Sequence, residues 1–424
     1  MANARKITQK ALCEVQINGA YSNITLNKFL SESDLSSEDK SLASAIFYGV
    51  LDRCITLDYV LSKYVKTPIK KVDATALTAL RVALYQIMFM DKIPESAAVN
   101  ESVKLVKSSK SKHLSGFVNG VLRNILRDGI SLPQGQCANS MSVNYSCPLW
   151  IVESFINDYG ADNAEQLLKH SLTAPQITVR VNTLKTDTKS LKQKLLEENI
   201  IAAETGVDNS LNISGGFDIS KSKAFKNGLF HIQDLSSQAA ISILSPSENE
   251  SVLDLCAAPG GKTFTMAQYM KNTGEITACD IYSHRLKLIS DGAKRLGINT
   301  IHTQINDATV YNEGLGKFDA VLCDVLCSGL GVIRRKPEIK YKDISEYTDI
   351  TKIQYQILEN ADKYLKENGR ILYSTCTVRK CENEAIVHTF LDKHSGYELK
   401  YEHTFMPHID GTDGFYCALL QKSR

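Results

Sequence analysis

The chain has 424 residues, of which 43% are hydrophobic and 23% are charged, and its net charge is +2. Domains usually contain about 100 to 200 residues, so we expect more than one domain. No apolar run reaches the roughly 18 residues that cross a bilayer, and the N-terminal MANARKITQK is not a secretory signal. We therefore expect no membrane contact and a cytoplasmic location.

Positive charge is concentrated in the front of the chain. Residues 1–130 carry 18 Lys and Arg against 12 Asp and Glu, whereas the remainder carries a net −4. Phosphate contacts need local positive charge, so a basic module that binds nucleic acid is one interpretation. A solvated basic face is at least as common a reason for such a distribution. The 11 cysteines lack zinc-ligand spacing, which predicts free thiols and no metal site.

The first 130 residues have the periodicity of helices. Apolar residues recur three and four positions apart, as at Leu77, Leu80 and Leu84, and Pro68 and Pro94 fall between periodic stretches. Strand signals are nearly absent. We predict an all-α bundle of about six helices over residues 1–130.

A linker and a small mixed module come next. Residues 131–147 lose periodicity and are rich in Gly, Pro, Ser and Asn, which is typical of a linker. Residues 148–235 combine short helices with the strand-like segments QITVRVN (176–182) and GLFHIQD (228–234). We predict a small α+β module there.

From residue 236 to the end, apolar strands alternate with helices. This alternation predicts a parallel sheet covered on both faces, in a Rossmann-like α/β domain over residues 236–424. Near the end, YELKYEHTF (397–405) and GFYCALLQ (414–421) predict an antiparallel hairpin. The expected parallel strands are SVLDLC (251–256), EITACD (275–280), IHTQIN (301–306), FDAVLCD (318–324) and GRILYST (369–375).

The strongest local motif is DLCAAPGGKT, residues 254–263, between a strand and a helix. Such a turn lets a ligand approach the backbone, and the helix N-terminus offers free N–H groups. The spacing is neither that of the dinucleotide motif nor that of a phosphate loop, and a structural turn is the alternative. The expected cofactor-binding residues are Cys256, Ala257, Ala258, Pro259, Gly260, Gly261 and Lys262.

Two acids follow the next two strands. Asp280 ends the second strand, where an open α/β sheet often has an acid that binds ribose hydroxyls. Asp307 follows the third strand and is a candidate for the exocyclic amine of an adenine. Each acid alone is more often a helix cap or a turn residue, but their positions at successive strand ends favour a nucleoside site.

Two cysteines follow the fourth and fifth strands. Cys327 lies in DVLCSG, three residues after Asp324, and Cys376 lies in YSTCTVRKCENE. Because ligands bind at the carboxyl edge of such a sheet, both thiols are expected to face one pocket. The ordinary interpretation of a lone cysteine is a small buried apolar residue.

These motifs resemble the RNA cytosine-C5 methyltransferase family throughout the C-terminal half. The front half resembles the NusB-type RNA-binding domain, notably at FVNGVLRNIL (117–126), and the combination is similar to the family's bacterial 16S ribosomal RNA type. The resemblance implies S-adenosylmethionine as cofactor, RNA, most specifically 16S ribosomal RNA, as partner, and a monomer. One departure is Leu326, where the family usually has a proline that fixes the loop.

The resemblance also assigns roles. It makes Cys376 the nucleophile that adds to carbon 6 of cytosine, and Cys327 the residue that assists release. Asp324 is expected to bond the base, and it also lies within the cofactor-binding set. The roles of the two cysteines can be exchanged, because DNA cytosine methyltransferases attack with the cysteine of a Pro-Cys motif. The cationic run Arg334, Arg335 and Lys336 is either a phosphate clamp or an exposed turn.

Other functions remain open. An RNA-binding assembly or antitermination factor has no need of the glycine-rich motif, Asp324 and both cysteines. An exocyclic-amine methyltransferase needs a polar-Pro-Pro-aromatic segment where this chain has DVLCSG. The same chemistry on transfer RNA is not distinguished by any residue.

Overall fold

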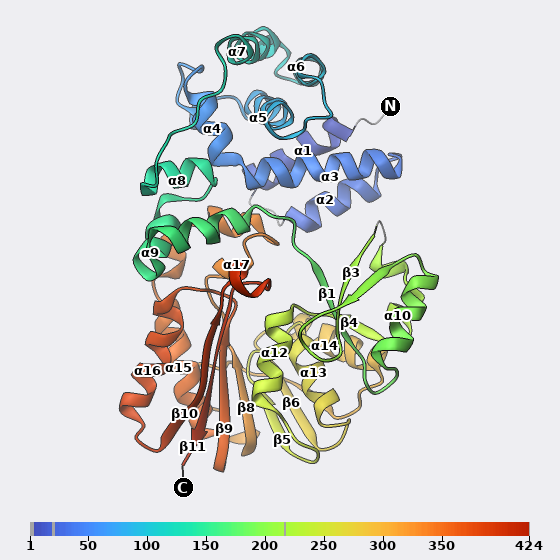
Figure 1. Ribbon diagram of the computed structural model, residues 1–424, viewed down its shortest axis with the longest axis vertical. Coiled ribbons are helices and arrows are strands. Elements are labelled where there is room, and N and C mark those ends of the chain that lie inside the picture. The colour runs from blue at the N-terminus through green and yellow to red at the C-terminus, as the bar shows by residue number, and fades with distance from the viewer. Residues whose placement is uncertain (1–3, 19–21, 216–217, 424) are drawn as a thin grey trace. The chain divides into compact units, whose positions relative to one another are not determined.

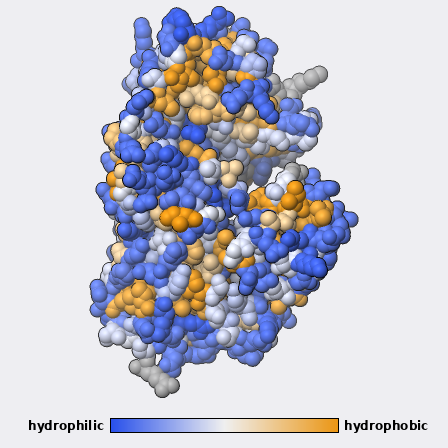
Figure 2. All heavy atoms as spheres, in the orientation of Figure 1, coloured by the Kyte–Doolittle hydropathy of each residue, from blue (hydrophilic) through white to orange (hydrophobic). Residues whose placement is uncertain are grey.

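The computed structural model describes residues 4–18, 22–215 and 218–423 and divides into two compact units (Figure 1). The first unit contains Met1–Thr173 and Ile333–Lys342, and the second contains Ala174–Val332 and Asp343–Arg424. Within the described ranges, no helix combines the length and the apolar character that a bilayer crossing requires. On the face shown in Figure 2, hydrophilic residues cover most of the surface of both units.

The described residues of the first unit form helices joined by loops, and the all-α fold predicted for residues 1–130 is confirmed. Leu80 and Leu84 of its central helix α5 are fully buried, and Leu77 is 8% exposed. Asp73 begins that helix by accepting the backbone N–H of Ala76. The elements are α1 (Ala4–Asn18), α2 (Ser22–Ser31), α3 (Ser37–Asp52), α4 (Cys54–Ser62), η1 (Ile69–Lys71), α5 (Ala74–Phe89), α6 (Glu95–Lys107), η2 (Lys112–Leu114), α7 (Ser115–Asp128), α8 (Ala138–Asn144), α9 (Leu149–Ser171) and η6 (Pro337–Tyr341).

The segment between residues 131 and 173 contains two helices. Helix α8 lies within the expected linker, and α9 lies at the start of the expected α+β module; both fall in the first compact unit. Helix α8 is held by tertiary hydrogen bonds, because the Thr56 hydroxyl donates to the carbonyl of Val143 and Ser146 accepts the N–H of Ile55. A helix of this kind has no apolar repeat of its own, so its sequence has the composition of a linker.

The second unit begins with a small antiparallel sheet in the order β2-β3-β1-β4. One face packs against helix α10, through Val179 and Val181 on the sheet and Leu191 and Leu195 on the helix. The predicted strands correspond to β1 and β4, whereas β2 and β3 were not predicted. The elements are β1 (Ile177–Val181), α10 (Thr188–Glu197), β2 (Ile201–Glu204), β3 (Ser210–Ser214), η3 (Ile219–Lys221), α11 (Lys223–Lys226) and β4 (Phe230–Ile232).

Buried polar side chains join this small sheet to the larger domain of the same unit. Asn182 donates its amide to the carbonyl of Leu296 at 2.8 Å, and the guanidinium of Arg180 lies 5.4 Å from the centre of the Tyr269 ring. His231 lies 3.3 Å from the Thr265 hydroxyl, and burial lowers its pKa to about 3, so its ring is neutral. The RVN and HIQD segments therefore have a structural role in this junction.

The larger domain has a seven-stranded sheet in the order β10-β11-β9-β8-β5-β6-β7. Strands β5 to β9 pair in parallel, and β11 runs antiparallel between β9 and β10, as the predicted hairpin requires. The elements are α12 (Leu235–Leu244), β5 (Ser251–Asp254), α13 (Gly261–Tyr269), β6 (Glu275–Asp280), α14 (Ser283–Leu296), β7 (Ile301–Ile305), η4 (Glu313–Leu315), β8 (Phe318–Asp324), η5 (Leu330–Val332), η7 (Ile344–Tyr347), α15 (Ile350–Lys363), β9 (Leu365–Thr375), η8 (Lys380–Glu382), α16 (Glu384–Lys393), β10 (Tyr397–Phe405), α17 (Pro407–Asp410) and β11 (Phe415–Lys422).

Helices cover both faces of this sheet. Successive residues of β5 belong to different cores, since Val252 packs with α12, α13 and α14 while Leu253 packs with α15 and α16. A strand buried on both faces has a continuous apolar sequence, which is why these strands were predictable. The fold directs the carboxyl ends of β5 to β9 to one edge of the sheet, where the candidate site lies.

Candidate active site

The turn between β5 and α13 has the geometry of a ligand-binding loop. Gly260 has φ +108°, and a Cβ added there would lie 2.6 Å from the ring of Phe264. The loop is held by bonds from the N–H of Ala257 to the carbonyl of Cys279 and from the N–H of Gly260 to the carbonyl of Ala257, both at 2.8 Å. The turn is therefore rigid and requires glycine at position 260.

Asp254 anchors the start of this loop. It is 1% exposed and accepts the Thr263 hydroxyl at 2.7 Å. Burial raises the pKa of its carboxyl to about 7, although the bond from Thr263 opposes the shift. The carboxyl therefore ties the end of β5 to the first turn of α13, and it was not singled out in the sequence.

Lys262, Asp324 and Ser374 form a network across three elements. The Lys262 ammonium lies 2.8 Å from Asp324 Oδ2, and the Ser374 hydroxyl donates to Asp324 Oδ1 at 2.9 Å. Burial alone would lower the pKa of Lys262, but the charges of Asp324 and Cys376 raise it above its ordinary value. The lysine is therefore a firmly protonated cation beside the end of β8.

The structure brings the two candidate cysteines together. Cys327 Sγ and Cys376 Sγ are 3.1 Å apart, although 49 residues separate them in the chain. Both thiols are partly exposed. The hydrogen bond between them and the burial of Cys327 raise the pKa of the Cys327 thiol well above its usual value, and the charge of Cys376 contributes to the shift.

The two other candidate acids lie at the ends of the neighbouring strands. Asp280 is 4% exposed; it accepts the N–H of Tyr282 at 3.0 Å and pairs with Arg285 at 3.1 Å. Asp307 is exposed, and its Oδ1 accepts the N–H and the hydroxyl of Thr309. Beside these acids, Ile281 is 51% exposed and Ile305 is 60% exposed, so carboxylates and accessible apolar side chains occur at the same strand ends.

The three cationic residues that follow the Cys327 loop differ in their exposure. Arg334 is 9% exposed, and its guanidinium lies 2.7 Å from His170 Nε2 within the helical unit. Arg335 is half-buried and Lys336 is exposed. Arg334 is therefore not part of an exposed charged turn, whereas Arg335 and Lys336 are accessible to solvent.

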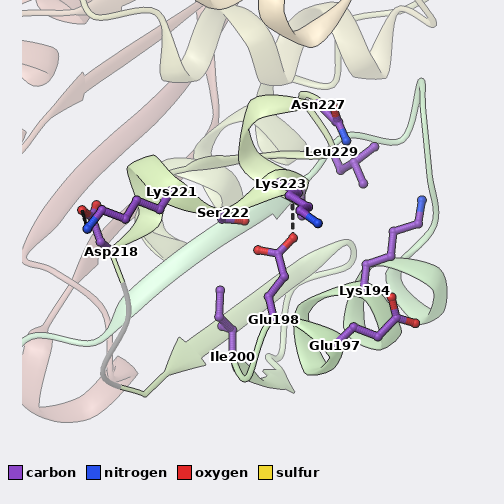
Figure 3. Close-up of a pocket in the computed structure, with 11 residues that line it drawn as sticks. Lys194, Glu197, Glu198, Ile200, Asp218, Lys221, Ser222, Lys223, Asn227 and Leu229 are labelled. Atoms are coloured by element: carbon purple, nitrogen blue, oxygen red, sulfur yellow. Dashed lines mark hydrogen bonds and ion pairs between the residues drawn. The ribbon is translucent and has the colours of Figure 1, made fainter.

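A separate hollow in the small module, shown in Figure 3, has no cysteine in its lining. Its lining includes three lysines, at positions 194, 221 and 223, but also Glu197, Glu198 and Asp218. Glu198 accepts the N–H of Ala224 at 2.9 Å at the start of α11. Opposite charges balance in this lining, so it lacks the positive potential that a phosphate site requires.

Three family models match successive parts of the chain. The NusB family matches residues 2–127, the RsmF/B-like ferredoxin-like domain matches residues 147–220, and the 16S rRNA methyltransferase RsmB/F model matches residues 241–421. The matches confirm the predicted fold class of a NusB-like front domain, a small module and a Rossmann-like C-terminal domain.

Curated relatives match this chain over almost its whole length. The probable ribosomal RNA small subunit methyltransferase B of Bacillus subtilis (strain 168) is 35% identical over 99% of both chains, and that of Synechocystis is 31% identical over 100% of both. The crystal structure of PH0851 is 27% identical, with a TM-score of 0.85 over 100% of this chain and 99% of that one. The chain therefore belongs to the RsmB/F family of 16S rRNA methyltransferases.

Proposed function

We propose that this chain transfers a methyl group from S-adenosylmethionine to carbon 5 of a cytosine in 16S ribosomal RNA, through a covalent bond between Cys376 and the base. The observation that carries the proposal is the pair of thiols 3.1 Å apart at the strand ends where Lys262 and Asp324 are paired. A nucleophile and a charged network at one edge of a sheet are what addition to a pyrimidine requires.

The loop and strand ends fit the proposed cofactor. The backbone turn from Cys256 to Gly261 suits the amino acid part, because it exposes N–H groups at the start of α13. Asp280 suits the ribose hydroxyls and Asp307 the adenine amine, while the accessible Ile281 and Ile305 suit the apolar faces of the adenine. When bound, S-adenosylmethionine supplies an electrophilic methyl group.

Cys376 has the role of nucleophile. Carbon 5 of cytosine is a poor nucleophile until a thiolate adds at carbon 6 and raises the electron density at carbon 5. A thiol with an ordinary pKa near 8.5 is only a few per cent ionised at neutral pH. The Lys262 ammonium interacts electrostatically with Cys376 and so favours its thiolate.

Asp324 and Lys262 together hold the base. Negative charge develops on the ring nitrogen and the carbonyl oxygen of cytosine as the thiolate adds, and the Lys262 ammonium is a donor for it. The Asp324 carboxylate accepts a hydrogen bond from the exocyclic amine. Uracil has a carbonyl at that position, so this contact distinguishes cytosine from uracil. Since the ammonium of Lys262 is bonded to Asp324, we assign this side chain to the base and only its backbone to the cofactor loop.

Cys327 has the role of base in the release step. Its thiolate takes the proton from carbon 5, the double bond between carbons 5 and 6 reforms, and the bond to Cys376 breaks with its electrons returning to sulfur. The target cytosine must leave its stack, or lie in a single strand, to reach these groups. We assign RNA binding to the NusB-like part and propose that the chain acts as a monomer.

The test is methylation of defined RNA. Purified protein is incubated with S-adenosylmethionine and unmodified 16S ribosomal RNA or transfer RNA, and 5-methylcytidine is measured by mass spectrometry of the digested RNA. We expect 5-methylcytidine only in the 16S RNA. Methylation of transfer RNA alone would reassign the substrate, and RNA binding without methylated cytosine would support an assembly factor.

A further inference from the structure

Two buried side chains hold the loop that carries Cys327. Gln354 of α15 donates its amide to the carbonyl of Leu326 at 2.9 Å and to Glu382 Oε2 at 3.1 Å. The same Glu382 oxygen accepts the backbone N–H of Ser328 at 2.8 Å. The backbone on both sides of Cys327 is therefore fixed by one pair of side chains, which we name the Glu382–Gln354 clamp.

The charge of Glu382 is fully enclosed by protein. Its side chain is 0% exposed, and its Oε1 pairs with Arg379 at 3.1 Å. A buried carboxylate is costly unless it is paired and hydrogen-bonded, and here the partners are Arg379, Gln354 and the backbone of Ser328. An apolar residue could fill this space, so a charge directed at the Cys327 loop indicates a role in the site.

The two thiols have charges of opposite sign near them. The hydrogen bond with Cys376 and burial raise the pKa of Cys327, and the charges of Cys376 and Glu382 raise it further. Cys376 instead interacts with the Lys262 cation. When the two thiols share one negative charge, that charge is therefore favoured on Cys376.

We propose that Glu382 is a positioning residue which, with Gln354, fixes the Cys327 loop and assigns attack to Cys376 and release to Cys327. The chemistry of this inference rests on the proposed function. The clamp also explains how the loop is ordered with Leu326 in place of the family's proline, because its carbonyl is held by Gln354.

The clamp fits each step of the reaction. After Cys376 has bonded to carbon 6, its sulfur carries no charge. The hydrogen bond to Cys376 and the charge of Cys376 then no longer raise the pKa of Cys327, so the Cys327 thiol loses its proton to water. The Cys327 thiolate then takes the carbon 5 proton while Cys376 leaves as a thiolate, which restores the starting state. The charge of Glu382 persists throughout and keeps the Cys327 thiolate basic.

The first test measures Cys327 without RNA. In a Cys376→Ser background, the rate of alkylation of Cys327 by iodoacetamide is followed against pH by mass spectrometry of the tryptic peptide 318–334. Glu382→Gln removes the charge at nearly constant size, so we expect the midpoint to fall by about one pH unit. Glu384→Gln is the matched control, because Glu384 accepts Thr404 and not the Cys327 loop. An equal midpoint in both variants would overturn the inference.

The second test separates positioning from charge. Gln354→Met removes the bond to the Leu326 carbonyl but leaves the charge of Glu382, so we expect covalent protein–RNA complex to accumulate on denaturing gels. Steady-state turnover should fall about tenfold or more, while the single-turnover rate of methyl transfer changes less. An unchanged turnover and no accumulated complex would contradict the clamp. This result decides the matter even if Glu382→Gln does not fold, and the melting temperature of that variant shows whether it folds.

These tests also distinguish failure of the clamp from failure of the proposed function. If the wild-type protein methylates no cytosine, the alkylation midpoints still decide whether Glu382 sets the ionisation of Cys327. If methylation occurs and the midpoints coincide, the function stands and the clamp is wrong.

Discussion

The loops after β8 and β9 each deliver one cysteine to the same point, but they differ in what holds them. The β8 loop with Cys327 is fixed by the buried Glu382 and Gln354. The β9 end with Cys376 lies near the Lys262 cation, and its Ser374 is bonded to Asp324. Two chemically identical thiols thus acquire different properties from one negative and one positive neighbour.

The difference shows how a site can choose between equivalent nucleophiles. The positions of the two thiols favour neither of them as the nucleophile, since they are 3.1 Å apart and both are partly exposed. Only their environments distinguish them, and those environments come from different elements, α13 for Lys262 and η8 for Glu382. Substitutions on either side should therefore change the chemistry in different ways.

The largest effect is expected at Cys376. Cys376→Ala removes the proposed nucleophile, so methylation should fall by at least about a thousandfold and no covalent RNA complex should form. The control is Cys381→Ala, an exposed thiol five residues further on. The rate of 5-methylcytidine formation measures both, and a Cys376→Ala enzyme with a tenth or more of the wild-type rate would contradict the assignment.

Asp324→Asn is expected to come second. The amide keeps the shape but loses the charge that pairs with Lys262 and accepts the exocyclic amine, so the single-turnover rate should fall about a hundredfold. Asp319→Asn, at the other end of β8 and paired with Lys366, should leave that rate unchanged. Equal rates for the two variants would remove Asp324 from the mechanism.

Lys262→Met should have a smaller effect that depends on pH. Without the cation, the Cys376 thiolate is less favoured, so the rate should fall about tenfold near pH 7 and recover in part as the pH rises. Lys271→Met, in the exposed turn after α13 where Lys271 pairs with Glu248, serves as the control. A pH profile parallel to that of the wild type would show that Lys262 acts on the base alone.

The smallest effect is expected at Leu326. Leu326→Pro keeps the carbonyl that Gln354 holds, so turnover should stay within about twofold and stability should rise by up to about 1 kcal/mol. In this background Gln354→Met should cost less turnover than in the wild type, because the proline supplies part of the same restraint. A tenfold increase in turnover from Leu326→Pro alone would mean that the clamp does not restrain the Cys327 loop.

The sequence predicted the sheet well and the small module in part. Strands β5, β8 and β9 are apolar because both faces are buried, so they were recognisable. Strands β2 and β3 have the short sequences IAAE and SLNIS; the first shows no alternation, and the second alternates over only two apolar residues. Strand β3 pairs with β1 and β2 pairs with β3, so these strands depend on tertiary pairing and not on local preference.

Only the part of the site that lies in recognisable sequence motifs could be predicted. The positions of Asp324, Cys327 and Cys376 at strand ends predicted that they meet. The pair of Lys262 with Asp324 joins residues 62 apart, and the bond of Glu382 to Ser328 joins residues 54 apart. Such contacts follow from the placement of β8 between β5 and β9, which no single-sequence pattern specifies.

The most direct test identifies the cysteine that bonds the base. The wild-type protein is incubated with S-adenosylmethionine and 16S RNA that contains 5-fluorocytidine, whose fluorine cannot leave as a proton does, so the covalent complex persists. After digestion with nuclease and trypsin, mass spectrometry locates the modified peptide. We predict the nucleotide on the peptide of residues 371–379, at Cys376. A nucleotide on the peptide of residues 318–334, at Cys327, would contradict the account by exchanging the roles of the two thiols.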